Sequence, residues 1–125
     1  MRILVANFFP AFCPPSSGGE QRYYHLYHHL SRWHDVTLLS ASYSDRPEEF
    51  VRHSTSFREY RVPKPGVADP LHWELYRAGI GDECSAYAVS LATAVASDLR
   101  ARFRDLLAYA DIVVHESPFT FALDE

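Results

Sequence analysis

The sequence predicts an α/β protein with a doubly wound, mostly parallel sheet and helices on both faces. Runs of consecutive apolar residues lie at Arg2–Asn7, Val36–Ser40 and Ile112–Glu116, and such runs are typical of strands buried on both sides. Segments with helical periodicity lie between the first two runs and before the third. Strands and helices therefore alternate, which indicates neighbouring parallel strands covered by helices.

The first β–α–β unit is expected within about the first 40 residues. Prolines, serines and glycines interrupt all periodicity in Phe8–Gly19, which predicts a loop after the strand Arg2–Asn7. From Glu20 onward, apolar residues recur at steps of three and four, which predicts a helix over Gln21–Arg32. This stripe consists of Tyr23, Leu26, Tyr27, Leu30 and Trp33.

The middle of the chain has weaker patterns. Ser44–Glu49 is polar and contains a proline, which is typical of a loop or the start of a short helix. Thr55–Val62 has strand character, and its charged residues favour an edge position. Asp69 and Pro70 have the pattern of a helix start, and Gly79 that of a helix end, so a two-turn helix is expected between them.

The longest periodic segment is Ser85–Ala110, within which we expect Ala88–Tyr109 to cover the sheet as one helix. The strand Ile112–Glu116 follows, and Pro118 ends it. Phe119–Leu123 has the pattern of a further helix start.

Length and composition favour one globular domain, residues 1–125. Apolar residues make up 47% and charged residues 22% of the chain, which is unlike a disordered segment. The net charge of −4 argues against nucleic-acid binding, which depends on clustered positive charge. With no export signal or membrane-spanning run in the sequence, we expect a cytoplasmic protein in which Cys13 and Cys84 are free thiols.

A candidate binding site is the segment Ser16–Glu20, which joins a strand end to a helix N-terminus. Unpaired amides and the helix dipole favour an anion there, and Gly18 and Gly19 allow the ligand to approach the backbone. The segment matches neither the dinucleotide fingerprint nor the nucleotide-binding P-loop. The alternative is an ordinary turn before a helix.

A second candidate is the pair His115 and Glu116 at a strand end. Either side chain could act as a base or bind sugar hydroxyls, but adjacent strand residues face opposite sides, so only one can enter a given cleft. The alternative is a pair of polar residues that simply end a strand. His25 and His29 are four residues apart on the predicted helix, but their polar face favours solvent exposure, and no metal site is predicted.

Four segments, in their order and separation, resemble the N-terminal domain of family-four glycosyltransferases with the GT-B fold. They are MRILVANFFP (Met1–Pro10), PPSSGGEQR (Pro14–Arg22), LSRWHDVTLLS (Leu30–Ser40) and ADIVVHESP (Ala110–Pro118). Trp33 departs from the pattern, because the family usually has glycine there. A positive φ at tryptophan would be costly, so we expect the helix to end differently here.

The resemblance implies a Rossmann-like domain that forms the acceptor-binding half of a transferase. Such an enzyme moves a sugar from a nucleotide-sugar donor to a glycan, lipid or small-molecule acceptor and uses no cofactor. Gly18 and Gly19, with Glu20 beside them, would approach the donor diphosphate. Glu116 aligns with the strand-end position near the transferred sugar, and His115 lies one residue earlier.

The resemblance also has consequences for partners. A donor-binding C-terminal domain, absent from this chain, would hold most of the nucleotide-sugar, so we expect the chain alone to be inactive. A lipid acceptor would bring the protein to the membrane surface. Without a partner domain, an apolar patch near Phe8, Phe9, Phe119 and Phe121 would remain exposed and favour self-association.

A single-domain flavodoxin-like or receiver-like binding module is the alternative. It accounts equally well for the alternation of strands and helices. A receiver domain, however, needs acidic residues where Asn7 and Phe8 stand, and a flavodoxin needs a hydroxyl-rich loop directly after the first strand. Ser16 and Ser17 come too late in the loop for that role.

Overall fold

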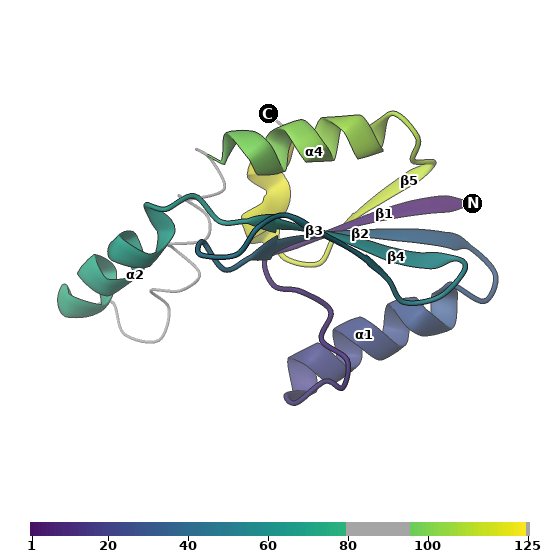
Figure 1. Cartoon of the computed structure of the whole chain (residues 1–125), viewed down its shortest axis with the longest axis horizontal. Coiled ribbons are helices and arrows are strands. Elements are labelled where there is room, and N and C mark those ends of the chain that lie inside the picture. Colours follow the sequence, from purple (N-terminus) through teal and green to yellow (C-terminus); the bar gives the residue numbers. More distant parts are fainter. Residues whose placement is uncertain (80–95, 125) are drawn as a thin grey trace.

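The computed structural model describes residues 1–79 and 96–124, which form a mixed, mostly parallel sheet with helices on both faces (Figure 1). The strands are β1 (Arg2–Asn7), β2 (Asp35–Ser42), β3 (Glu49–Arg52), β4 (Phe57–Pro63) and β5 (Ile112–His115). The helices are α1 (Gly18–Leu30), α2 (Ala68–Arg77), α4 (Ser97–Leu107) and the 3-10 helix η2 (Pro118–Leu123).

The sheet is five-stranded, in the order β3-β4-β2-β1-β5. β1 pairs in parallel with both β2 and β5, so that Val5 lies opposite Leu38 on one side and Val114 on the other. β2 pairs in parallel with β4, and β3 runs antiparallel to β4. The prediction that Arg2–Asn7, Val36–Ser40 and Ile112–Glu116 are neighbouring parallel strands is confirmed for these pairs, although β5 itself ends at His115.

Two apolar layers sandwich the sheet because successive residues of β1 point to opposite faces. Leu4 packs with Phe103 of α4 in one core cluster, and Val5 packs with Tyr23 of α1 in the other. Figure 1 shows α4 above the strands and α1 below them. The run of apolar residues in β1 is therefore explained by burial on both faces.

The middle segment departs from the sequence predictions at two points. Residues 44–48 form the predicted loop, but Glu49 begins strand β3, which no sequence pattern indicates. The segment Thr55–Val62 is not an edge strand, because β3 pairs outside it. The charges that suggested an edge are instead paired: Arg58 with Asp35, and Arg61 with Glu49.

The helices also depart from the sequence patterns. α4 begins only at Ser97, because Ala96 has φ −80° and ψ 80°, outside the helical region. The part of the predicted long helix that covers residues 85–95 lies outside the described residues. α1 ends at Leu30 with Ser31 in a right-handed conformation, and Trp33 avoids a positive φ as expected.

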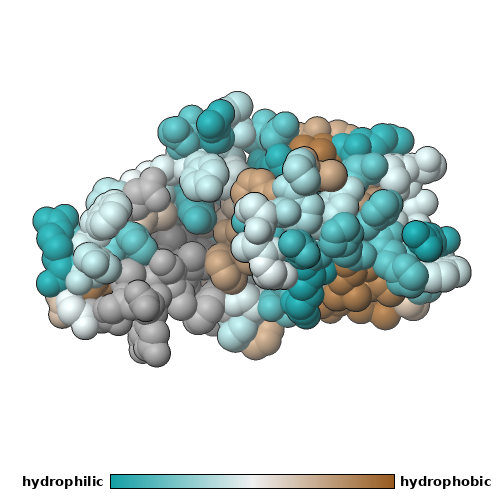
Figure 2. Space-filling view, turned by 90° about the horizontal axis from the view of Figure 1, so that it is seen from below, coloured by the Kyte–Doolittle hydropathy of each residue, from teal (hydrophilic) through white to brown (hydrophobic). Residues whose placement is uncertain are grey.

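Two surface features bear on the sequence predictions. Leu26 and Trp33, both assigned to the apolar stripe of α1, are exposed, and so is Phe121. Phe8 and Phe9 are half-buried, and the side chain of Phe119 lies outside the described residues, so self-association stays a prediction. Figure 2 shows hydrophobic residues at the surface among hydrophilic ones. Within the described helices, none combines the length and apolar character needed to cross a membrane.

Candidate functional site

A hollow of about 280 Å³ lies where the parallel strands β1, β2 and β4 end. The segment after β1, the first turn of α1, the end of β2 and the residue after β4 all contribute to it. Its lining residues are Phe8, Phe9, Pro10, Phe12, Ser17, Gly19, Glu20, Ala41, Ser42, Tyr43 and Lys64. The carboxyl ends of parallel strands are the usual place for ligands in open α/β sheets.

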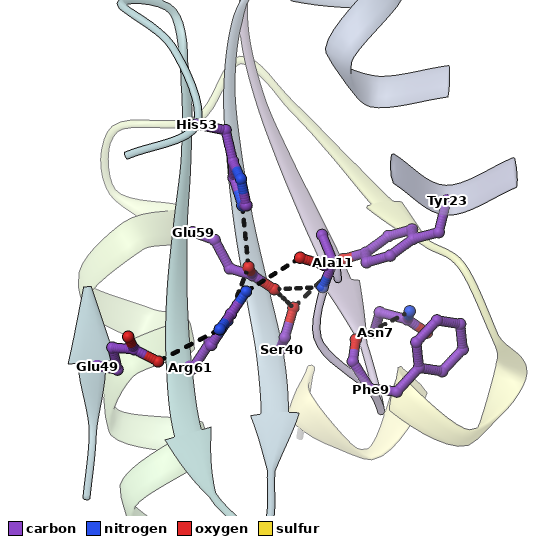
Figure 3. Close-up of polar contacts among 9 residues, drawn as sticks. All are labelled: Asn7, Phe9, Ala11, Tyr23, Ser40, Glu49, His53, Glu59 and Arg61. Carbon is purple, nitrogen blue, oxygen red and sulfur yellow. Dashed lines mark hydrogen bonds and ion pairs between the residues drawn. The ribbon is translucent and has the colours of Figure 1, made fainter. Parts of the chain in front are cut away.

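The loop after β1 is fixed by a carboxylate inside the sheet. Glu59 of β4 is completely buried and accepts hydrogen bonds from the amide of Ala11 at 2.8 Å and the hydroxyl of Ser40 at 2.6 Å. His53 Nε2 lies 3.0 Å from the same carboxylate, and Arg61 Nε donates to it at 2.9 Å (Figure 3). Four groups from separate segments thus converge on one side chain.

Arg61 completes the attachment of this loop. Its Nη2 donates to the carbonyl of Ala11 at 3.0 Å, so both backbone polar groups of Ala11 are held by β4. Burial alone would raise the pKa of Glu59, but hydrogen bonds from His53, Ser40 and the Ala11 amide, together with the charge of Arg61, hold the pKa below its ordinary value. Glu59 therefore stays ionised inside the sheet.

The N-terminus of α1 is closed by its own residues. Ser17 is the N-cap and accepts from the amide of Glu20 at 3.3 Å. The Glu20 carboxylate accepts from the amide and hydroxyl of Ser16, both at 2.7 Å, and from the amide of Ser17 at 3.3 Å. The hydrogen bonds from Ser16 lower the pKa of Glu20. A carboxylate therefore already lies at the helix end where the sequence predicted an anion site.

The two glycines lie in the first turn of α1. Neither has a positive φ, and a Cβ added at either would meet no atom within 4 Å. Gly19 lines the hollow, whereas Gly18 does not. Glycine is therefore not required at either position for the backbone conformation. At Gly19, the lack of a side chain leaves space at the edge of the hollow.

Glu116 follows β5 and faces α1. Its carboxylate receives Arg22 Nη1 at 2.6 Å and the hydroxyl of Tyr27, and its side chain is only 8% exposed. Burial of Tyr27 and its hydrogen bond to Glu116 raise the pKa of that phenol well above its ordinary value. The end of β5 is thus tied to α1 through Arg22 and Tyr27.

His115 lies on the other side of the sheet. Its Nδ1 is 2.8 Å from the hydroxyl of Thr120, and its Nε2 is 3.2 Å from the carboxylate of Asp124. Its ring contacts Phe103 and Phe121. The expectation that His115 and Glu116 face opposite sides is confirmed by these partners, and neither residue lines the hollow.

The histidines of α1 show no metal-binding arrangement. His25 and His29 are both exposed. Across residues 1–79 and 96–124, no three or more His, Cys, Asp or Glu side chains form a group that could hold a metal ion. Cys13 is a free and exposed thiol.

Sequence reasoning missed two residues of this region. The charge of Glu59 indicates a surface position on an edge strand, whereas its hydrogen-bond partners lie in segments distant in the sequence. Ser42, at the end of β2, is 6% exposed, and its buried hydroxyl has no hydrogen-bond partner among the residues that the structure describes. Ser42 lies beyond the predicted strand Val36–Ser40, so no sequence pattern indicates its burial.

Comparisons with known proteins add no identification. No family model matches the chain, and no match was found among curated proteins or solved structures.

We expect Glu59→Gln to destabilise the protein by about 3–5 kcal/mol, because it removes the charge that compensates the buried donors around it. Urea denaturation followed by circular dichroism measures this difference. Glu74→Gln on α2 is the matched control: Glu74 is exposed, so a change of about 0.5 kcal/mol or less is expected. Equal stability of Glu59→Gln and wild type would contradict the role assigned to Glu59.

Glu59 should also make stability depend on acid. Because its native pKa is lowered, its contribution is fully present above the ordinary value of 4.5 and is lost as the pH falls through the native pKa. Denaturation series below pH 4.5 should therefore show a smaller loss of stability for Glu59→Gln than for wild type. Parallel losses would contradict the lowered pKa.

Tyr27→Phe should cost about 1.5–3 kcal/mol, because it removes a hydrogen bond to a largely buried carboxylate. Thermal and urea unfolding measure the difference. Tyr76→Phe, on an exposed residue of α2, is the control and should change stability by about 0.5 kcal/mol or less. If both variants behave alike, the Tyr27–Glu116 contact does not stabilise the fold.

Proposed function

We propose that this chain is the acceptor-side half of a nucleotide-sugar-dependent glycosyltransferase, with a doubly wound, Rossmann-like arrangement of its sheet. The observation that carries the proposal is the hollow at the carboxyl ends of the parallel strands. It is bounded by the segment after β1 and by the glycine-containing first turn of α1, the same segments that carry the resemblance to family-four glycosyltransferases.

The proposed reaction is transfer of a glycosyl group. An acceptor hydroxyl oxygen forms a bond to the anomeric carbon of the donor, while the bond from that carbon to the diphosphate oxygen breaks. The diphosphate leaves with the electron pair, and the hydroxyl proton passes to the departing diphosphate or to solvent. Backbone amides at the first turn of α1, at Gly18 and Gly19, would stabilise the charge that develops on the diphosphate.

Glu116 is proposed to face the sugar that is transferred. Tyr27 and Arg22 hold its two carboxylate oxygens, and each oxygen keeps a further lone pair for a sugar hydroxyl. His115, fastened by Thr120 and Asp124, would keep the end of β5 in place from the opposite side of the sheet. A second, donor-binding domain would supply the remaining contacts to the nucleotide.

Gly19→Val in the enzyme that contains both halves should lower kcat on the order of 100-fold, corresponding to about 2.7–4 kcal/mol of transition-state stabilisation. A Cβ added at Gly19 meets no atom within 4 Å, so the substitution should displace ligand without unfolding the domain. Release of nucleoside diphosphate from a panel of nucleotide-sugars measures the rate, and circular dichroism checks the fold.

Gly66→Val is the matched control, because a Cβ at Gly66 also meets no atom within 4 Å and Gly66 does not line the hollow. It should retain near-normal turnover, as should His25→Ala and His29→Ala on the exposed face of α1. Normal turnover of Gly19→Val would contradict the role of Gly19. A yellow flavin that copurifies with the protein would favour the flavodoxin-like alternative.

A further inference from the structure

A second hollow, of about 290 Å³, lies at the opposite end of the strands from the first, and we call it the amino-end hollow. It lies on the sheet face that α4 covers (Figure 1). Leu4, Thr37 and Arg58 line it from neighbouring positions on β1, β2 and β4. The end of α4 and the segment that follows this helix form its other side.

Three arginines from three separate elements line the amino-end hollow. They are Arg2 of β1, Arg58 of β4 and Arg102 of α4. The Arg102 guanidinium lies 5.2 Å from the centre of the Tyr60 ring, which also lines the hollow. Among the described lining residues, Asp105 is the single carboxylate. Because guanidinium groups are always charged, the lining carries an excess of positive charge.

Each of these arginines is held by a carboxylate that does not line the hollow. The pairs are Arg2 with Asp111, Arg58 with Asp35 and Arg102 with Glu48, at N–O distances of 2.6–2.7 Å. These contacts orient the guanidinium groups but leave some of their donors unused.

The unused donors are on Arg58 and Arg102. Arg58 donates through Nε to Thr37 and through Nη2 to Asp35, so its Nη1 has no partner among the described residues. The Nη1 of Arg102 is 3.9 Å from the carboxylate of Asp105, which is too far for a hydrogen bond. A ligand in the hollow would therefore find oriented, charged donors.

The number of arginines favours a phosphate over a carboxylate as the anion. A carboxylate has two oxygens, and one guanidinium can satisfy both through paired hydrogen bonds. A phosphate monoester has three terminal oxygens and a charge between about −1.5 and −2 at neutral pH. It can therefore accept hydrogen bonds from several guanidinium groups at once and balance more of their charge.

The remainder of the hollow is apolar. Leu4 belongs to the core cluster on this face, and Leu106 and Ala110 pack against that cluster. The Tyr109 side chain also lines the hollow and is 70% exposed. Inorganic phosphate would leave this surface in water, whereas a ring attached to the phosphate would cover it.

We propose that the amino-end hollow binds a phosphate monoester that carries an aromatic ring. The phosphate accepts hydrogen bonds from Arg58 and Arg102, and the ring packs between Leu106 and Tyr109. This site is separate from the proposed transfer reaction, because it lies at the opposite end of the strands from the first hollow.

The test is an NMR titration of the 15N-labelled 125-residue chain with phenyl phosphate, inorganic phosphate, benzoate and phenol. Phenyl phosphate should cause saturable shifts of the Tyr60, Leu106 and Ala110 amides, with a Kd on the order of 1 mM. The other three probes each lack one part of the proposed ligand and should bind about fivefold more weakly or worse.

Two charge variants should change the affinity in opposite directions. Arg58→Gln should weaken phenyl phosphate binding about tenfold or more, because it removes charged donors. Asp105→Asn should strengthen binding roughly two- to fivefold, because it removes a like charge from the lining, and loss of folding cannot produce a gain in affinity. Arg46→Gln, on an exposed arginine outside this hollow, is the matched control and should bind normally.

Tyr109→Ala tests the ring contact. Because the Tyr109 side chain is largely exposed, its removal should weaken phenyl phosphate binding about threefold without unfolding the protein, and should leave the affinity for inorganic phosphate unchanged. Tyr76→Ala, on an exposed residue of α2, is the control and should bind both probes normally.

Several results would overturn the inference. They are equal affinity for phenyl phosphate and any of the other three probes, an unchanged Kd in both charge variants, or no shift of these amides with any probe. Shifts confined to Ser17 and Gly19 would place the phosphate in the first hollow and would also overturn it. None of these results contradicts the proposed transfer reaction, which the release of nucleoside diphosphate tests separately.

Discussion

The ionised Glu59 carboxylate inside the sheet is the constraint on which the geometry of this domain depends. A buried charge is tolerated only when donors surround it, and here the donors come from β2, from the loop after β1, from the segment after β3 and from β4 itself. Any displacement of that loop would remove the Ala11 amide from Glu59 and the Ala11 carbonyl from Arg61. One side chain therefore couples the order of the strands to the path of a proline-rich loop.

This coupling has a functional consequence, because the same loop forms one wall of the hollow. Phe9, Pro10 and Phe12 flank Ala11 on both sides, so their positions follow from its attachment to β4. The opposite wall belongs to α1, which is packed onto the sheet through Tyr23 and tied to the end of β5 by the contacts of Tyr27 and Arg22 with Glu116. Both walls are therefore attached to the sheet. A site on such a rigid scaffold loses little conformational freedom when a ligand binds.

The sequence predicted those parts of the fold that depend on local patterns. Apolar runs such as Arg2–Asn7 can be buried on both faces only in a covered parallel sheet, and the capping pattern at Ser17 and Glu20 marks the start of α1. Long-range pairing was beyond such patterns. The burial of Glu59 depends on partners in other segments, which local patterns do not reveal. Its charge therefore indicates an edge position for β4, and no pattern indicates that β3 pairs outside it.

Hydrogen exchange at the Ala11 amide tests the central claim, that Glu59 fixes the loop and so preforms the hollow. Native-state exchange measured by NMR should show this loop amide as protected as the amides in the middle of β2, because it opens only when the sheet does. In Glu59→Gln, the protection factor of the Ala11 amide should fall by orders of magnitude more than the protection factors of the β2 amides. Rapid exchange at Ala11 in the wild type, at the rate of an exposed loop, would contradict the account.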